Sequence, residues 1–371
     1  MVPMDAGDNA RNRRAFNGSL LILVLPLALL MLSGCNSSQH QTFIPSSSQV
    51  PTNFNQYQGT LAPFATSVAD HKASVTAAPT VDPYLSLGDL RSGTYVATIS
   101  DERGLALWSL DGHQIGVLAP IDDPTAALSP DASTIAYWAF NAGGLLLYDL
   151  DTHLVSHVAF KFDGADPTWS PDGDMLAFVT LPDGQGEDED WAALNVADLQ
   201  ANTSREIISW WTEELAPDWS PDGRLIAFVS NYRRDCVMCG RELFLLDTAC
   251  LASILNCEEF VDLRLANAMP DWAESPAWSP DGSMLAYICI SKENGQRDIC
   301  IIKLDSLEIT RVTTTSVAEA MPDWSPDGEW IAFSRYFEDQ RKKGVFIIRP
   351  DGSDEQLIAS GESFVFWYEK P

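Results

Sequence analysis

Short apolar segments alternate with tight polar turns from about residue 90 to the C-terminus. One unit, WSPDGDMLAF at 169–178, places a Ser-Pro-Asp-Gly turn before an apolar run with a central alanine. The unit recurs as WSPDGRLIAF at 219–228, WSPDGSMLAY at 278–287 and WSPDGEWIAF at 324–333, with the variant LSPDASTIAY at 128–137. Ser, Pro, Asp and Gly are the residues that a type I turn prefers at these positions. The pattern therefore predicts a tight turn between two short strands in each unit.

Each unit also contains a third apolar run that ends at an aspartate, and a weaker fourth one follows. The third runs lie at 105–111, 145–151, 243–247, 299–305 and 345–351, and 309–313 is an example of the fourth. The turns recur every 41 to 59 residues, as expected for one supersecondary unit per repeat with length variation in the loops. Four short antiparallel strands per repeat predict a β-propeller.

Five complete turn blocks predict five blades, and the two ends of the repeat region predict a sixth. Residues 91–97 resemble the turn and second strand of a first blade, and 105–111 supply its third strand. The C-terminal run 363–368 contains Trp367, which matches the repeated tryptophan. We therefore expect an all-β, six-bladed propeller of four-stranded antiparallel sheets, closed by the C-terminal strand so that no sheet edge is left open at the junction.

The repeated block resembles the repeat of the TolB-type β-propeller, a relative of the WD40-like propellers, over roughly residues 90–371. The tryptophans that carry this resemblance are expected to be structural: Trp169, Trp219, Trp278, Trp324 and Trp367. The resemblance implies the propeller fold and protein contacts in the bacterial envelope. The N-terminal α/β domain of TolB has no counterpart in the sequence.

The N-terminal region resembles a bacterial lipoprotein signal peptide. Three arginines (Arg11, Arg13 and Arg14) precede a thirteen-residue apolar run at 20–32, which is too short to span a bilayer. The run ends in Leu-Ser-Gly-Cys at 32–35, which is similar to a lipobox with Cys35 as the lipidated residue. An ordinary signal peptide or a short anchor, with Cys35 as a bystander, is the alternative.

These features predict three regions. Residues 1–34 form the signal peptide, 35–88 a lipidated, flexible tether rich in Ser, Thr, Pro and Gln, and 89–371 the propeller. The expected location is the cell envelope, in the periplasm or at the cell surface, with a lipid anchor in a membrane.

The charge balance restricts the partners. The chain has 23 Lys and Arg against 52 Asp and Glu, a formal net charge of −29. Nucleic-acid binding requires clustered basic residues, so we expect no nucleic-acid partner. Adhesion to anionic lipid head groups is disfavoured for the same reason.

A second set of acidic residues lies just before the predicted inner strands. If the ring closes as expected, these carboxylates fall near one mouth of the central channel, where they would attract a cation or a basic partner segment. They are Asp122, Asp123, Asp163, Asp166, Glu213, Glu214, Asp271, Glu274, Glu319 and Glu362. Ca²⁺ prefers such oxygen ligands and is the candidate cation. No other cofactor is expected. The alternative is a solvated acidic rim that keeps the protein soluble.

Six cysteines remain after Cys35, an even number that favours disulfides in an exported protein. Cys289 and Cys300 flank a predicted hairpin loop, and Cys250 and Cys257 bracket the loop after a third strand. Cys236 and Cys239 lie in a loop of the fourth blade. A zinc site built on Cys236 and Cys239, or free thiols, are the alternatives.

The sequence gives little support for catalysis. It contains neither a G-x-S-x-G nor an H-E-x-x-H motif, and the aspartate of each Pro-Asp-Gly turn is best explained as a turn former. We expect a membrane-anchored, non-catalytic binding or scaffold module that recognises an envelope protein or polymer through its loops and channel mouth. A metal-assisted lyase or hydrolase that acts on a polysaccharide at the acidic mouth is the alternative, and a purely structural surface protein is a third.

Overall fold

The computed structural model describes residues 84–100, 104–139, 144–158, 164–180, 192–208, 214–230, 241–252, 257, 260–262, 272–337 and 343–370. The chain divides into two units, residues 1–76 and 77–371, and all described residues belong to the second. The predicted signal peptide, Cys35 and most of the tether lie outside them. No helix within the described ranges is long and apolar enough to cross a membrane.

The described strands form six four-stranded antiparallel sheets, which we number as blades in chain order. Blade 1 contains β24 (Ser363–Lys370), β1 (Gly93–Ser100), β2 (Gly104–Ser109) and β3 (Gln114–Ala119); blade 2 contains β4 (Ala127–Leu128), β5 (Thr134–Ala139), β6 (Gly144–Asp149) and β7 (Val155–Val158). Blade 3 contains β8 (Gly164–Trp169), β9 (Met175–Thr180), β10 (Ala193–Asp198) and β11 (Thr203–Ile208); blade 4 contains β12 (Glu214–Trp219), β13 (Leu225–Ser230), β14 (Glu242–Asp247) and β15 (Phe260–Asp262). Blade 5 contains β16 (Trp272–Trp278), β17 (Met284–Ile290), β18 (Arg297–Lys303) and β19 (Ile309–Arg311); blade 6 contains β20 (Ala318–Trp324), β21 (Ile331–Tyr336), β22 (Lys343–Ile348) and β23 (Gln356–Ser360). Two 3₁₀ helices, η1 (Leu87–Asp89) and η2 (Thr248–Ala252), complete the described elements.

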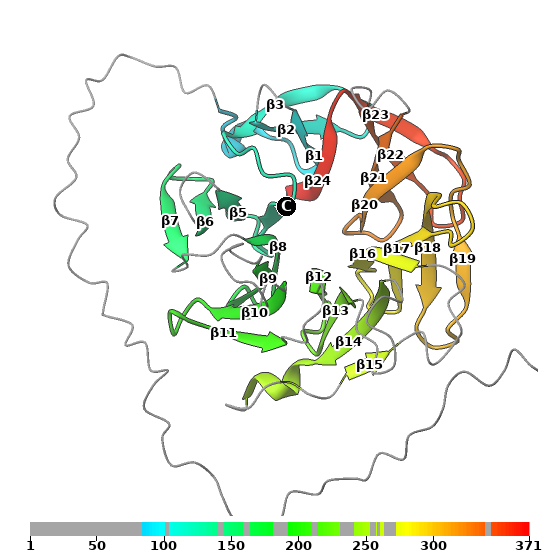
Figure 1. Ribbon diagram of the computed structural model, residues 1–371. Coiled ribbons are helices and arrows are strands. Elements are labelled where there is room, and N and C mark those ends of the chain that lie inside the picture. Colours follow the sequence, from blue (N-terminus) through cyan, green and yellow to red (C-terminus); the bar gives the residue numbers. More distant parts are fainter. Residues whose placement is uncertain are drawn as a thin grey trace, which may run out of the picture. The chain divides into compact units, whose positions relative to one another are not determined.

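The ring closes where the C-terminal strand joins the first blade. Strand β24 pairs antiparallel with β1, with Trp367 opposite Val96. Figure 1 shows these two strands side by side, although they come from opposite ends of the propeller sequence. The predicted all-β fold, the six blades and the closure by the C-terminal strand are therefore confirmed.

Each Ser-Pro-Asp turn is held by the same short hydrogen-bond network. In blade 4, Ser220 Oγ donates to Asp222 Oδ1 at 2.7 Å, and the backbone N–H of Arg224 donates to the same oxygen at 3.1 Å. The Leu225 N–H in turn donates to Ser220 Oγ at 2.9 Å. Ser-to-Asp bonds of the same kind occur in the turns that begin at Ser129, Ser170, Ser279 and Ser325. The prediction that these aspartates are turn formers is confirmed.

Neighbouring turns also stack on one another around the ring. Gly223 has a φ of +71°, and a Cβ built on it would lie 3.6 Å from the ring of Pro171 in the preceding turn. The pairs Gly173–Pro130, Gly282–Pro221 and Gly328–Pro280 repeat this approach. We call the side of the ring that carries these turns the turn face.

Apolar clusters fill the spaces between successive blades. The alanines in the middle of the second strands, such as Ala227 and Ala286, are fully buried, so adjacent sheets approach closely there. Within blade 4, Phe228 stacks on Phe244 with ring centroids 5.5 Å apart. Side chains of alternate direction along one strand belong to the clusters on its two sides, which is the period-two pattern that the sequence shows.

Two disulfides are present, Cys250–Cys257 beside η2 and Cys289–Cys300 between β17 and β18. Cys289 and Cys300 are almost completely buried in the cluster between blades 4 and 5. The expected loop and hairpin bonds are therefore present for these four cysteines. Cys236 and Cys239 lie outside the described residues.

The contacts of the propeller begin upstream of residue 89. The Leu85 N–H donates to the Val117 carbonyl of β3 at 2.7 Å, and the Leu87 carbonyl accepts a hydrogen bond from Lys370 Nζ at 2.8 Å. Leu85 and Leu87 also pack against the core of blade 1. The residues just before β1 therefore belong structurally to the first blade.

Candidate functional site

The inner strands of blades 3 to 6 share a backbone irregularity that shapes the centre of the ring. In each of them, the residue before a proline adopts a positive φ, and the pairing with the second strand shifts register there. These residues are Asp166, Ala216, Ser275 and Met321, with φ values of 53°, 48°, 48° and 52°. A left-handed conformation costs a residue with a Cβ about 1 to 2 kcal/mol. The bulge bends each inner strand between its start and its tryptophan.

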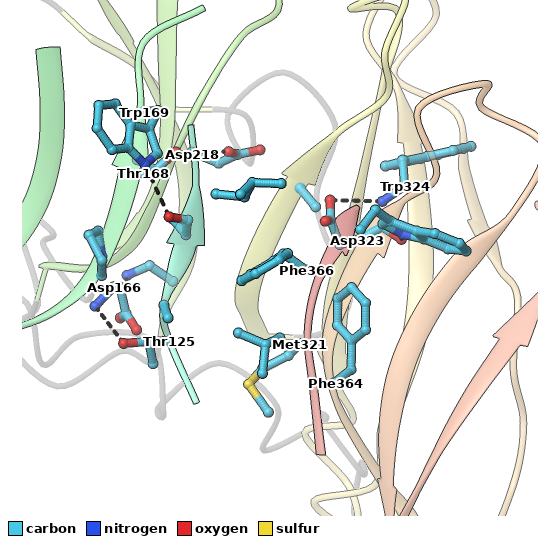
Figure 2. Close-up of a pocket in the computed structure, with 18 of the residues that line it drawn as sticks. Thr125, Asp166, Thr168, Trp169, Asp218, Met321, Asp323, Trp324, Phe364 and Phe366 are labelled. Atoms are coloured by element: carbon cyan, nitrogen blue, oxygen red, sulfur yellow. Dashed lines mark hydrogen bonds between the residues drawn. The ribbon is translucent and has the colours of Figure 1, made fainter. Parts of the chain in front are cut away.

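A cavity of about 860 Å³ lies among the six inner strands and extends to the turn face. Its wall combines carboxylates with apolar and aromatic side chains, as Figure 2 shows. The lining residues that matter below are Asp166, Thr168, Asp218, Met321, Asp323, Phe364 and Phe366. Ligand-binding cavities in proteins commonly have this size and this mixture of apolar wall and few polar groups.

Asp218 connects three neighbouring blades. Its carboxylate accepts hydrogen bonds from Thr168 Oγ1 in blade 3 at 3.3 Å and from the Trp278 backbone N–H in blade 5 at 2.8 Å. Burial nevertheless raises the pKa of Asp218 to about 7, because these hydrogen bonds and one from the Trp219 backbone only partly replace the lost water.

Asp323 has fewer partners than Asp218. Its Oδ1 accepts a hydrogen bond from the Trp324 N–H at 2.8 Å, and this contact is drawn in Figure 2. Burial, together with the nearby charge of Asp218, raises the pKa of Asp323 to about 8.

Asp166 is the third carboxylate of the cavity wall. Its Oδ2 accepts a hydrogen bond from the Ala216 N–H at 3.2 Å. Burial raises the pKa of Asp166 to about 6, with a smaller contribution from the charge of Asp123. The cavity therefore holds three carboxyl groups that ionise less readily than a solvated aspartate.

The repeated tryptophans connect the inner strands, but not in every blade. Trp278 Nε1 donates to the Asp218 carbonyl at 3.1 Å, and Trp367 Nε1 donates to the Asp323 carbonyl at 3.1 Å. Trp169 Nε1 makes the same bond to the Ala127 carbonyl. By contrast, the indole N–H groups of Trp219 and Trp324 are buried with no hydrogen-bond acceptor within the described residues.

Several of the described acidic residues that were predicted near one channel mouth are bound by partners within their own surroundings. Asp123 is buried, and its carboxylate accepts hydrogen bonds from the Thr125 N–H at 2.9 Å and the Trp138 N–H at 2.6 Å. It therefore connects the segment before β4 to β5 of blade 2. Asp122 is exposed beside it.

Glu274, Glu319 and Glu362 each bind partners close to their own blade. Glu319 is fully buried and pairs with Arg335, whose Nη2 lies 2.7 Å from Glu319 Oε1. Glu274 pairs with Arg241 and Arg297. Glu362 accepts hydrogen bonds from Thr98 Oγ1 and, at 3.1 Å, from Trp108 Nε1.

Of the predicted acidic set, the described cavity wall contains Asp166 alone. Glu214 is the first residue of β12, while Asp163, Glu213 and Asp271 lie outside the described residues. Where the chain is described, no group of three or more His, Cys, Asp or Glu side chains is arranged to hold a metal ion. Calcium binding stays a prediction.

Asp218 and Asp323 were not predicted from the sequence. Both line the cavity, and each immediately precedes a tryptophan in the sequence. A signal was present, because Pro-Asp-Trp occurs at 217–219 and 322–324, whereas the corresponding tripeptides of blades 3 and 5 are Pro-Thr-Trp and Pro-Ala-Trp. The bulge at the preceding residue turns this position toward the cavity, and its presence could not be inferred from strand alternation alone.

The solved structures most informative for comparison are propellers of low sequence identity. TolB from Acinetobacter baumannii superposes with a TM-score of 0.57 and 20% identity over 74% of this chain, and the match spans 66% of that TolB, just under two thirds. The putative TolB from Agrobacterium tumefaciens gives 0.51 and 17% over 76% of this chain and 100% of that one. A chain of a nidogen–laminin complex gives 0.53 and 8% over 74% and 97%.

At these identities the likeness concerns the fold. No family profile matches the sequence, and no curated protein matches it either. The repeated Trp-Ser-Pro-Asp-Gly block, the six closed blades and the superposition on two TolB structures agree with one another. The described body of this chain is a TolB-like six-bladed β-propeller.

Proposed function

We propose that the protein is a membrane-anchored binding module of the bacterial cell envelope, which recognises another envelope component through the centre of its propeller ring. The observation that carries this proposal is the cavity of about 860 Å³ among the inner strands, with its mixed wall of carboxylates, aromatic rings and methionine. A rigid ring that presents such a cavity is suited to binding, because the wall residues are already fixed by the blades.

The likeness of the fold to two TolB structures supports a role in the envelope. The sequence of the N-terminus supports export and anchoring, since a basic segment and an apolar run precede the Leu-Ser-Gly-Cys motif. In this proposal Cys35 carries the lipid, and the Ser-, Gln- and Pro-rich residues after it act as a leash.

The anchoring part is tested by the variant Cys35→Ser in the full chain. The wild-type protein is expected in the membrane fraction, with a mass increase on its N-terminal peptide that corresponds to the lipid. The variant is expected to lose that mass and to leave the membrane fraction. Equal membrane association of both proteins would contradict lipidation at Cys35.

The binding part is tested by site-specific photocrosslinking in cells. A photoreactive amino acid replaces Met321, which lines the cavity, or, as the matched control, Thr310, which is exposed on the outer strand β19. One crosslinked species of defined stoichiometry is expected from position 321 and not from position 310. Identical crosslinking patterns from both positions, or none from position 321, would contradict recognition through the ring centre.

A further inference from the structure

The carboxylates of the central cavity lack the arginine partner that several other acids of the ring have, as do the buried Asp123 and Glu362, which are held by hydrogen bonds alone within the described residues. Glu319, Glu274 and Asp298 each lie beside an arginine, with Asp298 paired to Arg311. Asp166, Asp218 and Asp323 make no ion pair with any described residue. A buried charge without a counter-ion is unfavourable, so folded proteins normally supply one.

The rest of the cavity wall supplies no cation either. Among the described residues, the lining includes Asp131 and Glu369 in addition to the three cavity aspartates, but no Lys, Arg or His. The described ionisable groups of the wall therefore all carry the same sign when ionised. A narrow site lined by one sign of charge focuses the field and attracts the opposite charge.

Part of the carboxylate surface is also available to a ligand. Asp323 uses one oxygen to accept the Trp324 N–H, and Asp166 uses one to accept the Ala216 N–H. No donor within the described ranges reaches the second oxygen of either group. Two acceptors in the cavity wall are thus free to receive hydrogen bonds from a bound group.

The apolar residues complete the recognition chemistry. Met321 lines the same cavity and is half-buried, while Phe364 and Phe366 of the closing strand β24 back the wall and are themselves buried. In Figure 2 these three side chains lie on the same side of the cavity as Asp323, with Phe366 nearer to it in this view than Met321 and Phe364. Such a wall accommodates an alkyl stem or stacks against a planar cation, while the carboxylates bind its charged end.

We propose that the central cavity binds the basic side chain of a partner protein, with Asp323 accepting a hydrogen bond from its ammonium or guanidinium group, Asp218 adding negative charge beside it, and Met321 against its apolar stem. This inference rests on the proposed binding function and names the chemistry that the ring centre recognises. The strongly acidic chain, with a net charge of −29, adds a long-range attraction for basic partners.

Binding depends on pH in this arrangement. Burial raises the pKa of Asp218 to about 7 and that of Asp323 to about 8, so both groups hold protons in part at neutral pH when the cavity is empty. A bound cation favours the ionised forms and releases these protons. The other ionisable groups of the cavity wall are Asp131, Asp166 and Glu369, all acidic, and Asp123 lies close enough to affect Asp166. Affinity therefore rises from pH 6 to pH 8.5.

The first test uses n-butylammonium as a mimic of the lysine side chain, with n-butanol as the uncharged control of similar shape. Dissociation constants are measured by ligand-observed NMR with the full chain at pH 6 and pH 8.5. We expect tighter binding of n-butylammonium at pH 8.5 and a loss of roughly tenfold or more in the variant Asp218→Asn/Asp323→Asn. The matched variant Asp222→Asn, on the turn face, keeps the wild-type affinity. Equal affinity for n-butanol, or an unchanged affinity in the double variant, overturns the proposal.

The second test identifies the source of the cation. The full-length protein with the photoreactive residue at position 321 is mixed with a solubilised envelope extract, either untreated or acetylated on its lysines. Loss of the crosslinked species on acetylation supports a partner side chain. A crosslink that survives acetylation but is displaced by spermidine overturns that source in favour of a free amine. If the crosslink forms normally in Asp218→Asn/Asp323→Asn, the cation inference fails while the proposed binding function stands.

Discussion

Blades 3, 4 and 6 carry aspartates in two very different environments, at the turn face and in the cavity wall. In blade 4 they are only four residues apart: Asp222 closes the turn, and Asp218 lines the cavity. The Ser220 hydroxyl and the Arg224 N–H lower the pKa of Asp222, which is exposed, whereas burial raises the pKa of Asp218 to about 7. The same residue type thus stabilises the fold at one site and opposes it at the other.

The two environments indicate which aspartates the fold requires. The turn aspartates Asp131, Asp172 and Asp281 repeat the arrangement of Asp222, and hydrogen bonds from the neighbouring serines lower their pKa values too. No such repetition exists in the cavity, where the corresponding position is Thr168 in blade 3 and Ala277 in blade 5. A structural requirement would apply to every blade, so the irregular distribution of the cavity carboxylates fits a role in binding.

The largest loss of stability is expected from opening the ring. An open ring no longer encloses the cavity, so the cavity aspartates become exposed like the turn aspartates. Deletion of residues 361–371 eliminates β24 with its buried aromatic residues Phe364, Phe366, Trp367 and Tyr368. Loss of one buried Phe or Trp side chain costs about 3 to 5 kcal/mol, and the whole stability of a domain is typically about 5 to 15 kcal/mol. We expect loss of cooperative thermal unfolding by circular dichroism. A truncated protein that melts like the full chain would show that closure is unimportant.

A smaller difference in stability is expected between tryptophans whose indole N–H donates a hydrogen bond to the cavity wall and those whose indole N–H does not. Trp278→Phe removes the Nε1 bond to the Asp218 carbonyl and leaves that acceptor unsatisfied, whereas Trp219→Phe removes an indole N–H without an acceptor. Both tryptophans are equally buried, so the loss of ring area is matched. We expect Trp278→Phe to be less stable than Trp219→Phe by about 1 to 2 kcal/mol in urea unfolding. Equal stabilities would mean that the indole bond contributes nothing.

Removing one carboxylate from each environment measures how much each contributes to stability. Asp222→Ala loses two hydrogen bonds at an exposed turn, so we expect its free energy of unfolding to fall by about 1 kcal/mol. Asp323→Ala removes a half-buried charge with no described counter-ion but also the acceptor of the Trp324 N–H, so we expect a smaller loss of stability at pH 8.5 than for Asp222→Ala. Urea unfolding of both variants at that pH is the measurement. A larger loss for Asp323→Ala than for Asp222→Ala would reverse the assignment of the two environments.

The smallest effect concerns the last position of the turn. Ala132 occupies it in blade 2 with a φ of 57°, whereas blade 4 has Gly223 with a φ of 71°. The left-handed strain on alanine exceeds the entropy cost of glycine by a small margin, so Ala132→Gly should stabilise the protein by about 0.5 kcal/mol. Gly223→Ala should destabilise it by a similar amount. Chemical unfolding of both variants checks the signs, and destabilisation by Ala132→Gly would contradict the strain argument.

Much of the fold follows from the sequence because the turn chemistry is local and repeated. The Ser-Pro-Asp-Gly turns, the strand that follows each of them and the completion of blade 1 by the segment with Trp367 are all visible as pattern. The cavity wall is less predictable, since it depends on bulges such as the one at Met321, which leave no periodic signature. The sequence pattern predicted acidic residues such as Glu319 at the channel mouth. The Glu319 partner Arg335 comes from another strand and cannot be identified from sequence spacing.

The dependence of stability on pH tests most directly the claim that the cavity carboxylates lack a counter-ion. A carboxyl group whose pKa is raised in the folded state binds more protons there than in the unfolded state, so its contribution to stability falls as pH rises from about 4 to the folded pKa. Each unit of pKa difference corresponds to about 1.4 kcal/mol. The measurement is the free energy of unfolding of the wild type and of Asp218→Asn/Asp323→Asn between pH 4.5 and pH 9. We expect the wild-type free energy of unfolding to fall more steeply with pH than that of the double variant, and parallel curves would show that the two carboxylates are not buried without a counter-ion.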